Sequence, residues 1–135
     1  MIVLDSSAMI EWLLGLPRAD AVGDRIVSAD SLHAPALLDV EVAQVVRRYT
    51  AAGEIDTRTG ERALSTLAEL DVNRYTHELL LPLIWQLRHN LTAYDATFLA
   101  LAAALDAPLI TLDARLARAP LPPLLGRTIA VEVLP

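Results

Sequence analysis

The sequence contains no cysteine and no lysine in its 135 residues. Without cysteine there are no disulfides and no thiolate metal sites, which suits a reducing cytoplasm. The sequence also lacks an uninterrupted apolar run of the ~18 or more residues that a transmembrane helix needs. No basic flank precedes the first apolar run, as it would in a signal peptide. We therefore expect a cytoplasmic protein that does not enter a membrane.

Positive charge is scarce as well. The 11 cations, all of them arginine, face 17 acidic residues, which gives a formal net charge of −6. General nucleic-acid binders normally carry a basic excess, so the composition disfavours that class. Guanidinium groups match phosphate geometry well, but GC-rich coding accounts for the same arginine bias and is the simpler explanation.

Short apolar segments alternate along the chain with longer segments of helical periodicity. We expect strands at residues 2–4, 32–34, 72–75, 109–112 and 129–133. We expect helices at residues 7–14, 19–29, 36–52, 57–70, 78–89, 92–105 and 114–119. Pro82 is compatible with the fifth helix only in its first turn. The alternation predicts one α/β domain over residues 1–135, a three-layer α/β/α sandwich around a mainly parallel sheet of four or five strands.

Two aspartates follow apolar segments of this kind. Asp5 comes directly after the first predicted strand, and Asp113 comes after the fourth. In open parallel sheets the ligand crevice lies outside the carboxyl ends of the strands, so both residues are candidates for one site. Taken alone, each aspartate is also explained as the N-cap of the helix that follows it.

Two further acids lie on predicted helices. Glu41 falls at the margin of an apolar stripe, where an unpaired carboxylate is costly to bury. An ion pair with Arg48 or simple exposure would explain it equally well. Asp95 opens a helix that is otherwise almost wholly apolar, and Thr92-x-x-Asp95 resembles a capping box with Asp in place of Glu.

The case for a site strengthens when these acids are combined, because the fold could bring all of them to one crevice. Four clustered carboxylates repel one another and would not stay ionised without a cation. Mg²⁺ and Mn²⁺ prefer oxygen ligands of this kind. Such ions activate water and stabilise developing charge in phosphoryl transfer.

The same segments resemble the PIN-domain family, and within it the VapC-type toxins of bacterial toxin–antitoxin pairs. The resemblance rests on IVLDSSAMIEWLL, ALLDVEVAQVVRR, NLTAYDATFLALAAAL and PLITLDARLARA, which span nearly the whole chain in the family's order. It implies a Mg²⁺- or Mn²⁺-dependent endoribonuclease. The implied metal ligands and catalytic residues are Asp5, Glu41, Asp95 and Asp113.

The resemblance implies further roles and partners. Ser6 and Thr111 match positions that often support the acids through hydrogen bonds. The family also implies an RNA substrate, homodimers and a cognate VapB-like antitoxin whose C-terminal segment occupies the groove beside the site. Candidates for contacts with the RNA backbone are Arg47, Arg48, Arg115 and Arg118, which follow the second and fourth acids. Solvated helix faces explain these arginines equally well.

Two other functions fit part of the pattern. One is a non-catalytic binding module with the PIN fold, in which the acids are structural. The other is an aspartate-based phosphatase or phospho-receiver with Asp5 as the acceptor. Such phosphatases have a second aspartate two residues later, where this chain has Ser7, and both classes use a lysine that this chain lacks.

Overall fold

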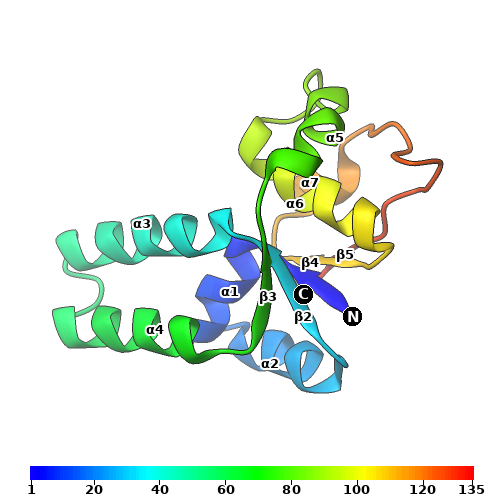
Figure 1. Cartoon of the computed structure of the whole chain (residues 1–135). Coiled ribbons are helices and arrows are strands. Elements are labelled where there is room, and N and C mark those ends of the chain that lie inside the picture. The colour runs from blue at the N-terminus through cyan, green and yellow to red at the C-terminus, as the bar shows by residue number, and fades with distance from the viewer.

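The centre of the fold is a sheet of five parallel strands in the order β3-β2-β1-β4-β5, seen in a computed structural model that describes all 135 residues (Figure 1). The strands are β1 (Ile2–Leu4), β2 (Leu32–Pro35), β3 (Val72–Tyr75), β4 (Leu109–Thr111) and β5 (Val131–Val133). Every neighbouring pair is parallel. The predicted α/β class and parallel sheet are therefore confirmed.

Helices connect the strands at nearly all of the predicted positions. They are α1 (Ser6–Leu13), α2 (Ala19–Ser28), α3 (Leu37–Ala51), α4 (Thr57–Glu69), α5 (Leu81–Gln86), α6 (Ala93–Leu105) and α7 (Ala114–Arg118), with a 3₁₀ turn at Glu78–Leu80. The single helix predicted at 78–89 is thus divided. Pro82 lies in the first turn of α5, because proline has no N–H to continue the preceding turn.

The core lies on both faces of the sheet. Helix α6 packs against β1, β2 and β4, while α1 packs against α2 on the other side of the sheet (Figure 1). Because α6 is apolar almost all round, it buries eight of its residues, including Phe98 and Leu99. None of the helices has the length and apolar character needed to cross a membrane.

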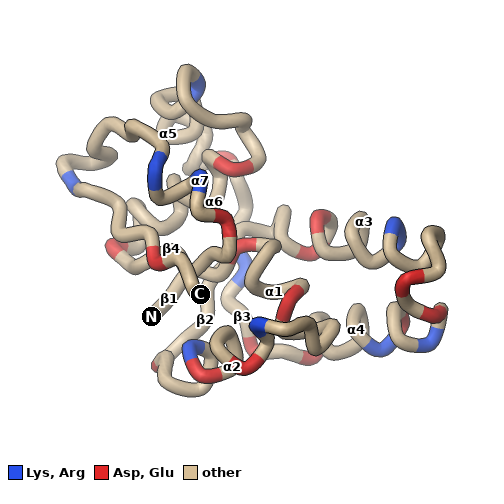
Figure 2. The backbone as a smooth tube through the Cα atoms, turned by 180° about the vertical axis from the view of Figure 1, so that it is seen from behind, with Lys and Arg blue, Asp and Glu red and all other residues tan.

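Helices α3 and α4 form a hairpin that extends away from the sheet and carries charges of both signs at its tip (Figure 2). Gly53 follows α3 with a φ of +74°, a left-handed conformation that favours glycine and suits the predicted helix end. Gly60 allows the helices to approach closely. A Cβ atom at this position would lie 3.1 Å from both Thr50 Oγ1 and Val46 Cγ1.

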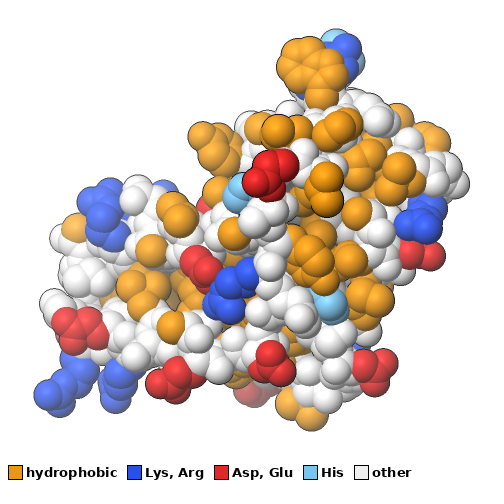
Figure 3. Space-filling view, in the orientation of Figure 1, with side chains coloured by type: hydrophobic (Ala, Val, Ile, Leu, Met, Phe, Trp, Pro, Cys, Tyr) orange, Lys and Arg blue, Asp and Glu red, His pale blue; other side chains and the backbone are white.

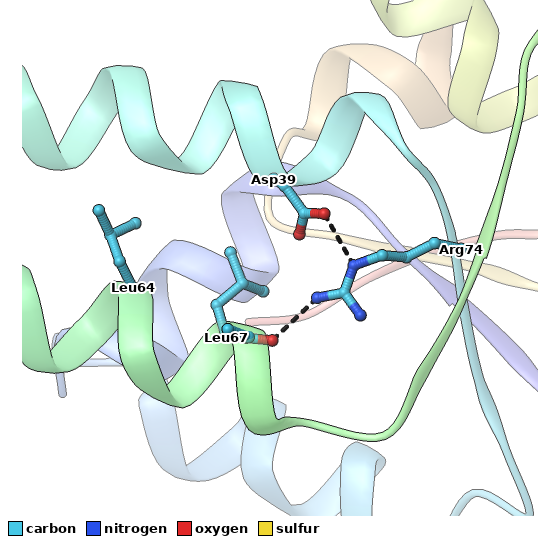
Figure 4. A pocket seen from close by; sticks show the side chains of 5 residues that line it. Asp39, Leu64, Leu67 and Arg74 are labelled. Carbon is cyan, nitrogen blue, oxygen red and sulfur yellow. Dashed lines mark hydrogen bonds and ion pairs between the residues drawn. The ribbon is translucent and has the colours of Figure 1, made fainter.

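Arg74 of β3 joins the base of this hairpin to the sheet (Figure 4). Its Nε donates to Oδ2 of Asp39 on α3 at 2.8 Å, and its Nη2 donates to the Leu67 carbonyl on α4 at 2.8 Å. A hollow of about 450 Å³ beside this pair is lined partly by Leu64 and Leu67. This hollow contains none of the acids predicted to bind metal.

Candidate metal-binding active site

The candidate site lies where the order of the strands reverses. From β1 the chain proceeds to β2 and β3 on one side, whereas β4 and β5 lie on the other side, so the switch point falls between β1 and β4. Asp5 leaves the end of β1, and Asp113 follows the end of β4. Such a switch point is where open α/β sheets bind their ligands.

The carboxylate of Asp5 is buried, with the residue only 6% exposed, and both of its oxygens are bonded. Oδ1 accepts hydrogen bonds from the Ala8 amide at 3.0 Å and from Ser7 Oγ at 2.7 Å. Oδ2 accepts a hydrogen bond from Thr111 Oγ1. Asp5 is therefore the N-cap of α1, and the same bonds fix its carboxylate at the switch point.

Ser7 is a contributor that the sequence analysis did not identify. Besides donating to Asp5, its Oγ accepts a hydrogen bond from the Leu112 amide at 3.0 Å. It therefore connects the start of α1 to the segment after β4. Serine at a helix start commonly bonds to nearby backbone, so the pair of serines after Asp5 was a usable signal, but Leu112 lies 105 positions away.

Glu41 lies on α3, where Ser6 holds it in place. Ser6 Oγ donates to Glu41 Oε1 at 2.8 Å, and Ser6 is the direct neighbour of Asp5 in the chain. The ion pair between Glu41 and Arg48 that the sequence suggested does not form, and neither residue takes part in any ion pair of the structure. Glu41 is half-buried.

Asp95 lies in the first turn of α6, where its backbone completes half of a capping box. The Asp95 amide donates to Thr92 Oγ1 at 3.3 Å. The Asp95 carboxylate does not return a bond to Thr92, and it accepts no other hydrogen bond from the protein. The half-buried carboxylate of Asp95 is therefore free of protein partners and open to solvent on one side, and capping does not explain its position.

Asp113 caps α7 and forms an ion pair with Arg115. Its Oδ1 accepts from the Arg115 amide at 2.9 Å, and Arg115 Nη2 lies 2.5 Å from Oδ2. Of the other arginines considered for RNA contacts, Arg47 donates to Gln44 Oε1 at 3.1 Å. Arg48 and Arg118 form no ion pair.

Burial raises the pKa of Asp5 and Glu41, and neighbouring acids add to the effect. For Asp5, burial is the largest cause, the bonds described above lower the pKa, and the charge of Asp113 raises it. Burial likewise raises the pKa of Glu41; the bond from Ser6 opposes this, and the charges of Asp95 and Asp5 increase it. These carboxylates are thus close enough to disfavour one another's ionisation.

The pKa values of Asp95 and Asp113 move in opposite directions. Burial raises the pKa of Asp95, while Arg115 lowers it and Asp113 raises it. The hydrogen bonds and charge of Arg115 hold the pKa of Asp113 below its usual range. Arg115 is therefore the one basic side chain that offsets negative charge here.

Comparison with known proteins identifies the fold. Residues 2–121 match the PIN domain. The chain belongs to the PIN-domain family. It is 43% identical over 119 residues to ribonuclease VapC1 of Mycobacterium tuberculosis, and the match covers 87% of this chain and 90% of VapC1. The predicted resemblance to VapC-type PIN domains is therefore confirmed.

Two solved PIN-domain structures share the architecture. One is VapC20 of Mycobacterium tuberculosis, a Sarcin-Ricin loop cleaving toxin, with a TM-score of 0.67, 16% identity and coverage of 87% of this chain and 94% of VapC20. The other is VapBC2 from Rickettsia felis bound to a DNA fragment from its promoter. It has a TM-score of 0.72, 12% identity and full coverage of both chains. At these identities the similarity concerns the fold.

The acids of this PIN domain suit a hard divalent ion in their chemistry, because all of their donor atoms are carboxylate oxygens. The structure does not gather three or more acidic or histidine side chains into an arrangement that holds an ion. Asp113 is instead bonded to Arg115. Arg115 therefore competes with an ion for the carboxylate of Asp113.

Proposed function

We propose that this PIN domain is a metal-dependent endoribonuclease, the toxin of a toxin–antitoxin pair, which uses water to cleave RNA phosphodiester bonds. The observation that carries the proposal is the hydrogen bonding at the switch point of the sheet, where Ser6 holds Glu41 beside Asp5 and Thr111 links Asp5 to Asp113. Identity to VapC1 over most of the chain supports RNA as the substrate. The single core of 30 buried residues supports one functional domain over residues 1–135.

In this proposal the carboxylates of Asp5, Glu41, Asp95 and Asp113 hold Mg²⁺ or Mn²⁺. When bound, the ion supplies an activated water and positive charge opposite the phosphate. Thr111 and Ser7 keep Asp5 in one orientation, as Ser6 does for Glu41. Such supporting bonds matter because small displacements of ligands weaken both metal binding and catalysis.

The activity itself is tested with purified protein and single-stranded RNA in Mg²⁺, in Mn²⁺ and in EDTA. We expect cleavage only with a metal ion. We expect Asp5→Asn to abolish cleavage, whereas Asp71→Asn, at an exposed position, serves as the matched control and should cleave normally. Intact RNA with wild-type protein in both metals would contradict the proposal, as would full activity of Asp5→Asn.

The alternative of a non-catalytic PIN module is separated from this proposal by calorimetry. We expect Mn²⁺ to bind the wild-type protein and to bind Asp5→Asn much more weakly, since that variant loses one carboxylate ligand. Absence of Mn²⁺ binding would favour the non-catalytic module. The phospho-receiver alternative gains no support from the sequence, because the chain lacks the lysine that this class uses.

We also propose a VapB-like antitoxin as partner and a homodimer as the assembled form, acting in the cytoplasm. The similarity to the VapBC2 complex supports the antitoxin. Apolar side chains that gather over the 3₁₀ turn and α5 support the dimer (Figure 3). Leu79 is 90% exposed, Leu81 57% and Trp85 66%, and exposed apolar clusters mark interfaces.

The partners are tested separately. If expression of this chain arrests growth, co-expression of a VapB-like antitoxin should relieve the arrest, and the antitoxin should copurify with this chain. Light scattering should give twice the mass of the chain, and Leu79→Asp should give the monomer. A monomeric wild-type protein would contradict the homodimer.

A further inference from the structure

A second hollow, of about 420 Å³, lies directly beside the candidate site. Helix α3 supplies Glu41, Gln44 and Arg48 to its wall, and the starts of α1 and α6 supply Ser6 and Tyr94. Glu41 is at the same time one of the acids proposed to bind metal, and Ser6 donates a hydrogen bond to it. A molecule bound in this groove therefore lies next to the acids proposed to bind metal.

The groove offers an exposed aromatic ring. Tyr94 is 63% exposed and directly precedes Asp95, so its ring stands at the border between the groove and the site. Val40, 68% exposed, also lines the groove. An aromatic face of this kind can stack on any of the nucleobases.

The polar side chains of the groove suit the rest of a nucleotide. Gln44 accepts from Arg47 through Oε1 at 3.1 Å, which leaves its amide N–H groups available for the edge of a base. Arg48 forms no ion pair, whereas five other arginines do. An unpaired guanidinium beside an acidic cluster complements a phosphate rather than a further cation.

We infer that this groove is a subsite for one unpaired nucleotide of the RNA, with its base stacked on Tyr94 and its phosphate on Arg48. The inference rests on the proposed ribonuclease function and narrows its substrate to single-stranded RNA or loops. A base within a duplex is stacked on both faces and cannot present one to Tyr94. Of the two neighbouring arginines on α3, Arg48 lines the groove and Arg47 does not, so only Arg48 is assigned to the phosphate.

Binding without turnover tests the inference. Fluorescein-labelled hexamers of A, C or U are titrated in EDTA, where the proposed nuclease is inactive, and anisotropy is recorded. We expect Tyr94→Ala to weaken binding about 5- to 100-fold, whereas Tyr94→Phe, which keeps the ring, stays within about twofold of wild type. Wild-type protein should bind hexamers without bases only weakly. Its affinity for them should equal the affinity of Tyr94→Ala for hexamers that carry bases.

The phosphate contact has its own readout. Arg48→Gln should reduce the slope of log K against log salt by about 0.7, the value for one phosphate contact on a single strand. Arg58→Gln makes the same charge change at the start of α4, outside the groove, and should leave the slope unchanged. Equal slopes for wild type and Arg48→Gln would remove Arg48 from the inference and overturn it.

Two outcomes would overturn the subsite as a whole. One is equal RNA affinity of wild type and Tyr94→Ala. The other is conversion of a dimer to a monomer by Tyr94→Ala, seen by light scattering, since the groove would then be an interface between copies of the chain. Failure of the proposed function differs from both, because it leaves a wild-type protein that binds the hexamers and does not cleave RNA in Mg²⁺ or Mn²⁺.

Discussion

Thr111 donates a hydrogen bond to Oδ2 of Asp5 and thereby joins the end of β4 to the end of β1. The same hydroxyl accepts a hydrogen bond from the Asp113 amide at 3.0 Å. Thr111 is completely buried. One hydroxyl thus holds the side chain of one proposed ligand and the backbone of another, and this places Asp5 and Asp113 at a fixed separation along the sheet edge.

Replacing Thr111 by Val should destabilise the protein while keeping the shape of the side chain. The change leaves Asp5 Oδ2 and the Asp113 amide without this partner, and a buried unpaired polar group costs about 1–3 kcal/mol. Urea unfolding measures the loss. Thr111→Ser keeps the hydroxyl and should lose only about 0.8 kcal/mol for the methyl group. Equal stability of Thr111→Val and wild type would show that the bond is not structural.

Asp95→Asn should have opposite effects on stability and metal response. Burial raises the pKa of Asp95, so ionising this side chain costs more in the folded protein than in water, and its carboxylate has no hydrogen bond to lose. We expect the neutral amide to raise the melting temperature in EDTA at pH 7.5 by about 1–3 °C. The increase in melting temperature caused by Mn²⁺ should shrink or vanish.

The exposed Asp71 provides the control for that experiment. Asp71→Asn makes the same chemical change away from the cluster, so it should alter neither the melting temperature in EDTA nor the response to Mn²⁺. If Asp95→Asn were destabilising in EDTA, its carboxylate would be part of the fold rather than a site residue that lowers stability in exchange for function.

Stability of the metal-free protein should fall as pH rises from about 4 towards neutral. The pKa values of Asp5, Glu41 and Asp95 are raised in the folded state. Their contribution to the free energy of unfolding is therefore fully present below their usual pKa values. It is lost as pH rises through the raised pKa values. Asp113, whose pKa is lowered, acts in the opposite sense, and its contribution is lost only as pH falls below its usual value.

Metal binding should show the reverse trend with pH, because ligands must be deprotonated to bind an ion. The stabilisation by Mn²⁺ should be small near pH 5 and grow towards pH 8, with protons released on binding. Calorimetry in two buffers of different ionisation enthalpy counts these protons. An affinity for Mn²⁺ that does not rise with pH, with no proton released at any pH, would contradict the raised pKa values.

The sequence predicted the main features of the fold because local patterns determine them. Asp5 and Asp113 follow short apolar strands, and the parallel alternation was sufficient to place both at one sheet edge. Side-chain partners are different, since they depend on residues brought together from distant parts of the chain. The bonds from the Leu112 amide to Ser7 and from Ser6 to Glu41 span 105 and 35 positions, and neither is encoded in a local pattern.

Helix ends were also harder to predict than helix positions. The sequence alone predicted one helix over 78–89, but Pro82 restarts the helix and α5 ends at Gln86. Likewise, Thr92 and Asp95 match a capping box in sequence, yet only the bond to the Asp95 amide forms. The freedom of the Asp95 carboxylate is a property of side-chain geometry that the motif does not reveal.

Arg115→Gln should increase the affinity for Mn²⁺ about two- to fivefold, the range expected for breaking an exposed ion pair. In the metal-free protein Arg115 occupies both carboxylate oxygens of Asp113, so it competes with the ion for this ligand. Arg118→Gln removes the same charge from the same helix without an ion pair and is the control.

If both variants gained affinity for Mn²⁺ equally, the cause would be the loss of one positive charge near the site rather than the loss of the ion pair. If only Arg115→Gln does, Asp113 is released on metal binding, and the freed guanidinium is then available to an RNA phosphate. The same variant should accordingly bind metal more tightly and RNA more weakly when Mn²⁺ is present, a combination that loss of a purely structural ion pair would not produce.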